Sequence, residues 1–171
     1  MTDQPRILDT WALQPTLDRG ADLRHDTEEL DRLWSTARLI VVDREGRFSE
    51  SLGSASVGEY EPERHLFLGR VDGAPWFAMR GDVGAHEVIS LREQAIDSPE
   101  REVATAAVAL LAWHERARFC ERCGHGTRVS AAGFARRCDG CGAEHFPRTD
   151  PAVIVAIVDS ADRLLLAHQV T

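Results

Sequence analysis

The chain has 171 residues, 43% of them hydrophobic, and a formal net charge of −8 at pH 7. It is too apolar for a disordered protein, and its acidic balance excludes a chain that binds nucleic acid over its whole surface. The longest mostly apolar run, residues 103–113, is far shorter than the roughly 20 residues that cross a bilayer. The start of the chain lacks the basic and apolar segments of a signal peptide, so we expect a cytoplasmic protein without a membrane segment.

The first 95 residues predict a strand-rich, mixed α/β domain. Residues 26–37 favour a short helix, and residues 39–42 favour a strand that ends in a turn. Residues 65–68 and 75–79 are apolar runs on either side of an Asp-Gly turn, a pattern typical of a β-hairpin. Arg44 and Arg47 lie in the first of these turns, where we expect them to be solvated rather than to bind phosphate.

A longer helix is predicted to begin at Ser98-Pro99-Glu100, because serine caps free amides, proline is tolerated in the first turn and a carboxylate favours the positive end of the helix dipole. Apolar residues then recur every three or four positions, which predicts one face packed in the core. These residues are Val103, Ala106, Ala107, Leu110, Trp113 and Ala117.

Four cysteines follow this helix as C-x2-C-x14-C-x2-C, with glycine directly after each pair. They are Cys120, Cys123, Cys138 and Cys141. Two residues between thiolates let one tight turn present both sulfurs to a tetrahedral ion, and 14 residues suffice for a small hairpin between the pairs. We therefore predict a four-cysteine metal site that stabilises a zinc ribbon, so that chelation should unfold residues 119–146.

The sequence favours some alternatives to a structural zinc site over others. Rubredoxin-like iron uses the same ligands and stays open, whereas two disulfides do not suit a cytoplasmic chain. A catalytic zinc is disfavoured because four cysteines leave no open position, and His125 and His145 are expected to be bystanders. Seven arginines against three carboxylates between Arg116 and Arg148 give this segment a local charge of +4, which would fall to about +2 with bound zinc.

After the cysteines, residues 152–158 predict a buried strand, and residues 163–167 predict a second strand across a turn. The segment between ribbon and strand, Phe146-Pro147-Arg148-Thr149-Asp150-Pro151 with a following Val-Ile, resembles the NADH pyrophosphatase branch of the Nudix hydrolases, which includes enzymes that remove NAD caps from RNA. The resemblance also covers Trp113 to Gly124 and Leu91-Arg92.

The resemblance implies an α/β (α+β) N-terminal domain over residues 1–115, a four-cysteine zinc ribbon over 116–147, and the first β-hairpin of an incomplete Nudix domain over 148–171. It implies a homodimeric hydrolase that cleaves NAD(H), or NAD-capped RNA, to NMN(H) and AMP with Mg²⁺ or Mn²⁺. The four cysteines would bind Zn²⁺. Phe146 and Arg92 would contact the substrate, through stacking and through phosphate respectively.

The catalytic Nudix box, G-x5-E-x7-R-E-x2-E-E-x-G, does not occur in this sequence, because no Arg-Glu pair is followed by Glu-Glu at the required offset. No carboxylates are arranged to hold the metal ions that pyrophosphate hydrolysis needs. We therefore expect the chain alone to be inactive, with the catalytic residues beyond Thr171. The alternative is a non-enzymatic zinc-ribbon module that binds nucleic acid or protein.

Overall fold

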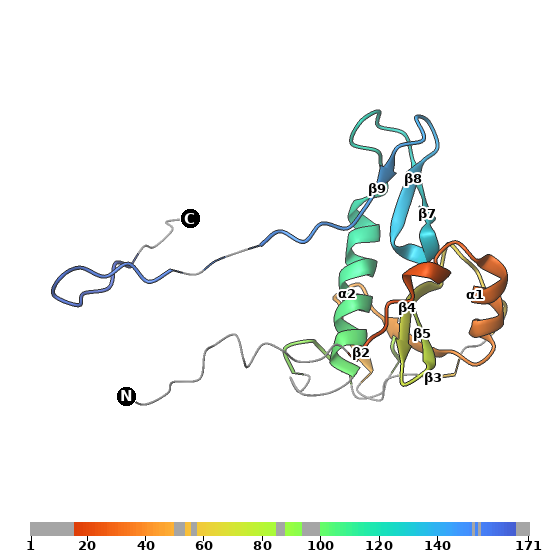
Figure 1. The fold of residues 1–171 in the computed structure, drawn as a ribbon, viewed down its shortest axis with the longest axis horizontal. Coiled ribbons are helices and arrows are strands. Elements are labelled where there is room, and N and C mark those ends of the chain that lie inside the picture. The colour runs from red at the N-terminus through yellow and green to blue at the C-terminus, as the bar shows by residue number, and fades with distance from the viewer. Residues whose placement is uncertain are drawn as a thin grey trace.

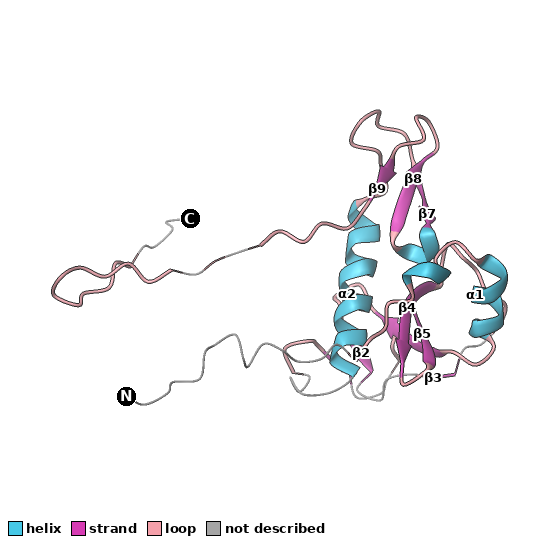
Figure 2. Cartoon of the chain, viewed as in Figure 1, coloured by secondary structure: helices cyan, strands magenta, loops and turns pink. Residues whose placement is uncertain are grey.

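The computed structural model of the chain describes residues 16–49, 54–55, 58–84, 88–93, 100–151, 153 and 155–166. These residues form a six-stranded sheet, a three-stranded sheet and the helices around them (Figures 1 and 2), so the predicted mixed α/β class is confirmed. None of the described helices is long and apolar enough to cross a membrane. The elements are η2 (Ala21–Leu23), α1 (Thr27–Trp34), β1 (Arg38–Val42), β2 (Phe48–Ser49), β3 (Ser54–Ala55), β4 (Leu66–Val71), β5 (Ala74–Arg80), β6 (Val88–Ile89), α2 (Glu100–Arg116), β7 (Thr127–Ser130), η3 (Ala131–Gly133), β8 (Ala135–Cys138) and β9 (Glu144–His145).

The larger sheet has the order β4-β5-β1-β2-β6, and β3 also pairs with β1. The predicted hairpin is present: Asp72 and Gly73 have φ angles of 51° and 81° between β4 and β5, which is the left-handed backbone that a tight two-residue turn requires. The other neighbours pair antiparallel, but β1 and β5 are parallel, with Leu39 opposite Phe77. Sequence patterns alone did not predict this parallel pairing.

The sheet lies between α1 and α2 (Figure 1), and its strands contribute side chains to both faces. Along β1, for example, Leu39 packs on the α1 side and Ile40 on the α2 side, as the two-residue period of a strand requires. The side chains buried most completely are Trp76, Phe48, Phe67, Phe77, Ile40, Leu66, Leu68, Val42 and Val103. The core of the molecule is therefore the two faces of this sheet.

Both helices confirm the predicted segments with small differences. Asp26 caps α1, since its Oδ1 accepts a hydrogen bond from the Glu29 amide at 3.0 Å. Ser98 and Pro99, predicted to start α2, lie outside the described residues. Trp113, predicted in the core, is only half-buried, whereas its neighbour His114 on the last turn of α2 contacts Gly133 of the ribbon. The face that α2 buries consists of Val103, Ala104, Ala107, Leu110 and Leu111.

The small sheet, β7-β8-β9, contains the hairpin predicted between the cysteine pairs. Its tip, η3, packs against the larger domain: Ala132 joins the α1-side core, and Phe134 packs on the α2-side core. Gly133 has a φ of 103°, and a Cβ there would lie 2.9 Å from the Leu66 Cβ. The ribbon is therefore joined to the sheet domain at a tightly packed surface that tolerates only glycine at this position.

The C-terminal hairpin differs from the prediction. Its turn forms, with the Asp159 amide donating to the Arg163 carbonyl at 3.1 Å, and Val158 pairs with Leu164 in an isolated bridge. The described residues on either side form no strand, and their apolar side chains are exposed, from 53% for Leu164 to 86% for Val153. A strand needs a neighbouring strand and a buried face, and the described residues offer this segment neither.

Candidate metal centre

The two cysteine pairs sit on turns that share one backbone pattern. The Gly124 amide donates to the Cys120 carbonyl at 2.8 Å, and the Gly142 amide donates to the Cys138 carbonyl at 3.1 Å. Both glycines have positive φ angles, 75° and 71°. In each turn the amide of the first cysteine donates five residues ahead, to His125 and Ala143 respectively. The repeated C-x2-C-G sequence therefore folds twice into the same turn, and glycine makes the reversal possible.

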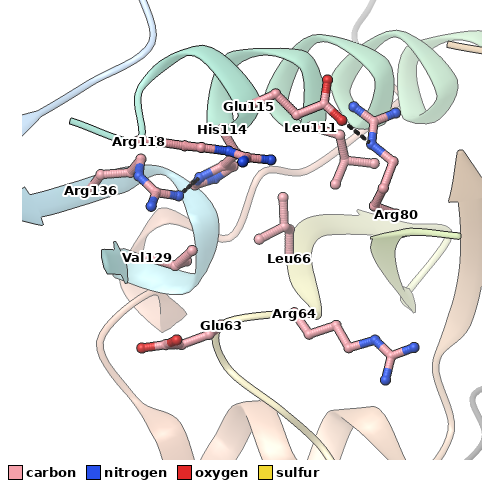
Figure 3. Close-up of a pocket in the computed structure, with 10 residues that line it drawn as sticks. All are labelled: Glu63, Arg64, Leu66, Arg80, Leu111, His114, Glu115, Arg118, Val129 and Arg136. Carbon is pink, nitrogen blue, oxygen red and sulfur yellow. Dashed lines mark hydrogen bonds and ion pairs between the residues drawn. The ribbon is translucent and has the colours of Figure 1, made fainter. Parts of the chain in front are cut away.

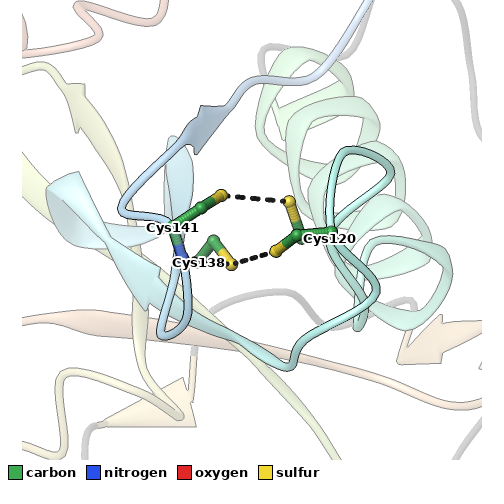
Figure 4. A group of neighbouring side chains, drawn as sticks. Cys120, Cys138 and Cys141 are labelled. Carbon is green, nitrogen blue, oxygen red and sulfur yellow. Dashed lines mark hydrogen bonds between the residues drawn. The ribbon is translucent and has the colours of Figure 1, made fainter.

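The four sulfurs converge between these turns, of which one follows α2 and the other begins at the end of β8 (Figure 4). All four ligand atoms lie within 4.8 Å of one another. Sγ of Cys120 is 3.7 Å from that of Cys141, and Sγ of Cys123 is 3.4 Å from that of Cys138. Zn–S bonds of about 2.3 Å in a tetrahedron place sulfurs about 3.8 Å apart, so the donor set fits one ion. The separations are far too long for disulfides, and all four cysteines are free.

Backbone amides favour the thiolate form of Cys138. The amides of Cys141 and Gly140 approach the Cys138 sulfur at 3.4 and 3.3 Å and lower the pKa of that thiol to about 6. Four sulfur donors fill a tetrahedral shell and leave no position for substrate or water, as in structural zinc sites. The two nearby histidines have other contacts: His125 Nδ1 lies 3.3 Å from the Cys123 carbonyl, and His145 Nδ1 lies 3.9 Å from a Glu121 carboxylate oxygen.

The two predicted substrate residues are not brought together in this chain. Phe146 directly follows β9 and is 60% exposed, whereas Arg92 is exposed in the turn after β6. β9 lies near the C-terminal end of α2, while β6 pairs with β2, near the other end of that helix (Figure 1). Both side chains are accessible, but one molecule of this chain does not place them around one small ligand. Arg47 is engaged locally, with its Nε 2.8 Å from Asp43 Oδ2.

Sequence reasoning missed a polar network where the ribbon meets α2. His114 Nε2 lies 2.8 Å from the Gly133 carbonyl, and His114 Nδ1 lies 2.9 Å from Arg136 Nη1. A carbonyl only accepts and a guanidinium only donates, so these contacts fix a neutral ring with its proton on Nε2. Burial lowers the pKa of His114 to about 4, and the charge of Arg136 acts in the same direction. No local motif predicts this contact, because His114 and Arg136 are 22 positions apart in the sequence.

A cavity of about 310 Å³ opens beside this network (Figure 3). It lies between the end of α2, the start of β4, the end of β5 and the ribbon hairpin. Its walls are formed by Glu63, Arg64, Leu66, Arg80, Leu111, His114, Glu115, Arg118, Val129 and Arg136. The zinc ribbon thus contributes one wall of a hollow whose other walls belong to the sheet domain.

Comparison with known proteins agrees with the geometry of the ribbon. Residues 115–146 match the family described as the NADH pyrophosphatase zinc ribbon domain. The NAD-capped RNA hydrolase NudC of Mycobacterium tuberculosis is 36% identical over 169 residues, which covers 89% of this chain and 54% of the relative. NudC of Stutzerimonas stutzeri is 36% identical over 108 residues, covering 59% of this chain and 38% of the relative.

A more distant relative, the NAD-capped RNA hydrolase NUDT12 of Macaca fascicularis, is 30% identical over 116 residues, covering 55% of this chain and 25% of the relative. The chain spans about half the length of the mycobacterial relative, 54%. Both the ribbon match and the similarity across the sheet domain agree with the resemblance seen in the sequence. Residues 115–146 therefore belong to the NADH pyrophosphatase zinc ribbon family, and the chain is similar to a NAD-capped RNA hydrolase along 89% of its length.

Proposed function

We propose that this chain forms the N-terminal domain and zinc ribbon of a homodimeric, cytoplasmic NAD(H) diphosphatase. The complete enzyme would hydrolyse the pyrophosphate of NAD(H), or that of NAD-capped RNA, and release NMN(H) and AMP from the dinucleotide. The observation that carries the proposal is the 36% identity to a mycobacterial NAD-capped RNA hydrolase along 89% of the chain. Mg²⁺ or Mn²⁺ would serve the chemistry, and Zn²⁺ on the four cysteines would serve only the fold.

The chain's own contribution would be structural and positional. Its four sulfurs hold the ribbon together, and the ribbon presents Phe146 on an exposed segment. The Nudix glutamates that would collect the catalytic metal ions are not in this sequence. Arg92 and Phe146 lie far apart in one molecule, so a shared site would need a second copy or a further domain. We therefore expect no hydrolysis by the 171-residue chain alone.

A chimera tests this division of labour. The chain would be joined to the part of the M. tuberculosis relative that it does not cover, and AMP release from NADH would be measured with Mg²⁺ or Mn²⁺. We expect activity from the chimera and none from the chain alone. A Cys123→Ser chimera should lose most activity, whereas Arg122→Ser, an exposed neighbour that offers no sulfur, should not. Robust AMP release by the unfused chain would overturn the proposal.

The same chimera tests the two substrate residues. If Phe146 stacks on the substrate, Phe146→Ala should lower kcat/KM by a factor of about 2 to 10, because an aromatic contact contributes about 0.5–1.5 kcal/mol. Phe146→Tyr keeps the ring and should retain activity. Phe119→Ala, at another exposed phenylalanine of the ribbon, is the matched control. Arg92→Ala should raise KM if the guanidinium binds phosphate. Unchanged kinetics in both variants would remove these residues from the site.

A second candidate function is nucleic-acid binding by the ribbon itself. Arg122, Arg128 and Arg137 are exposed on it, although Arg128 already lies 2.5 Å from Asp139. Fluorescence anisotropy with a short single-stranded RNA at several salt concentrations would test it. A log–log slope of about −0.7 for each phosphate contacted, reduced in Arg122→Gln and Arg137→Gln, would favour a binding module. Affinity confined to NAD-like dinucleotides would favour the hydrolase.

A further inference from the structure

The cavity at the ribbon–sheet junction has a positively charged wall. Arg136 projects into it from β8, and Arg118 projects into it from the segment between α2 and the first cysteine turn (Figure 3). Two other arginines of the lining are engaged with carboxylates. Arg80 Nε is 2.9 Å from Glu115 Oε1, and Arg64 Nη1 is 3.4 Å from Glu61 Oε1. The charge that the cavity offers to a ligand therefore comes from Arg118 and Arg136.

Arg136 is held rigidly, and only by neutral groups. Its Nε donates to Thr127 Oγ1 at 2.7 Å, its Nη2 donates to the Thr127 carbonyl at 2.5 Å, and its Nη1 donates to His114 Nδ1 at 2.9 Å. Thr127 is itself fixed, since its hydroxyl donates to the Ala117 carbonyl at 2.6 Å. A guanidinium has five N–H donors, so two remain beyond these three bonds. No carboxylate of the described residues forms an ion pair with this guanidinium.

Arg118 adds a second cation to the same wall. Its side chain is exposed, and within the described part of the chain it makes no ion pair. The lining contains two glutamates, and Glu115 forms an ion pair with Arg80. Glu63 has no ion pair among the described residues, and it lies across the cavity from His114 (Figure 3). Two arginines against one glutamate leave an excess of positive charge. A planar guanidinium held in one orientation suits the paired oxygens of a phosphate.

Another part of the lining is apolar. Leu66, Leu111 and Val129 line the cavity beside the two arginines (Figure 3). The volume of about 310 Å³ is at the lower end of the range for small-molecule sites and exceeds the need of a bare phosphate ion. We propose that this cavity binds a phosphate monoester of a small organic group, with the phosphate on Arg118 and Arg136 and the organic part against the apolar side chains.

This site would be separate from pyrophosphate hydrolysis, and its test does not depend on that activity. It does depend on the ribbon. Arg118 and Arg136 each lie two residues before a cysteine of the cluster, and the Thr127 amide donates to the Arg118 carbonyl at 2.9 Å. Folding of the ribbon therefore sets the spacing of the two guanidinium groups. Chelation of the metal should abolish binding of the phosphate compound while the sheet domain stays folded.

Isothermal titration calorimetry on the zinc-loaded 171-residue chain tests the proposal. The ligands are ribose 5-phosphate, 5′-AMP, inorganic phosphate, adenosine and a short RNA with no terminal phosphate. We expect both phosphate monoesters to bind, inorganic phosphate to bind more weakly and adenosine not to bind. Arg118→Gln should weaken binding roughly tenfold or more, because it removes a charge-assisted contact. Arg44→Gln, at an exposed arginine of the β1–β2 turn outside the lining, should change nothing.

Glu63→Gln should raise the affinity for the phosphate compound, a result that a misfolded variant would not give. Removing this carboxylate relieves repulsion of the phosphate, so affinity should rise by a factor of about two to five at low salt. Binding of the RNA but of neither phosphate monoester would overturn the proposal, because this RNA carries phosphodiesters only. No binding of any phosphate compound, or affinity indifferent to Arg118→Gln and Glu63→Gln, would overturn the proposal.

Discussion

The sheet domain and the ribbon are stabilised by different means although they share a surface. The sheet domain buries large side chains completely, among them Trp76, Phe48 and Phe77. The buried residues of the ribbon are small or are metal ligands: Cys120, Thr127, Ala132, Gly133, Ala135 and Cys138. Such residues remove little apolar surface from water, so the ribbon needs the metal for its stability. The comparison shows that one chain combines a domain stabilised by a hydrophobic core with a ribbon stabilised by a metal site.

Removal of the metal should have the largest effect of the changes considered. It should unfold the ribbon and leave the sheet domain folded. Structural zinc contributes on the order of 10 kcal/mol to the folding of such sites, so chelation or Cys123→Ser should expose the ribbon amides. Hydrogen exchange should show protection lost in β7 and β8 and kept in β4 and β5. Arg122→Ser is the control beside the same turn. If the ribbon amides stayed protected from exchange after complete removal of the metal, the ribbon would not depend on the metal for its stability, contrary to our expectation.

A core substitution should have the converse effect. Phe77 is fully buried, and its ring centroid lies 5.2 Å from those of Trp34 and Phe67. Phe77→Ala should lower the free energy of unfolding by about 3–5 kcal/mol, because it leaves a cavity. Urea denaturation with an independent zinc-release assay would measure both regions. Phe146→Ala, which truncates a side chain that is 60% exposed, should cost less than about 0.5 kcal/mol.

The surface shared by the two regions should weaken in acid. The pKa of His114 is lowered to about 4, chiefly by burial, so the folded state binds this proton less readily than the unfolded chain. The stability from the neutral ring is present above pH 6.5 and is lost as the pH falls towards 4. The loss should be on the order of 2–3 kcal/mol.

His114→Gln should remove this part of the pH dependence, because an amide can donate to Gly133 and accept from Arg136 without titrating. His25→Gln, at an exposed position, is the matched control. Protonation of the cysteines affects all three proteins alike, so the difference in unfolding free energy between pH 7 and pH 5 isolates His114. Parallel pH profiles for His114→Gln and the parent chain would refute this role.

The sequence predicted what depends on local patterns. Cysteine spacing placed the four sulfurs, the Asp-Gly turn placed the β4–β5 hairpin, and the segment beginning near Asp26 placed α1. It did not predict the parallel pairing of β1 with β5, or the packing of Gly133 on Leu66, because both join distant segments. The cavity at the junction was missed for the same reason.

In the C-terminal segment, the local sequence pattern predicted an element that does not form. Its apolar run predicted a strand, yet the described residues there are exposed and form only a turn with one bridge. The composition of a strand specifies a side-chain pattern, but the strand itself depends on a partner in space. The ribbon has such a partner within the chain, since β8 pairs with both β7 and β9.

The smallest effect expected is that of the surface ion pair on the ribbon. Arg128 Nη1 lies 2.5 Å from Asp139 Oδ1, with about half of each side chain exposed, 53% and 54%. A double-mutant cycle with Arg128→Gln and Asp139→Asn should give a coupling below about 1 kcal/mol, because solvent screens the charges. The same cycle at roughly 0.5 M salt should give less. A coupling of several kcal/mol would mean that charges between β7 and the second cysteine turn, and not the sulfurs alone, hold the ribbon together.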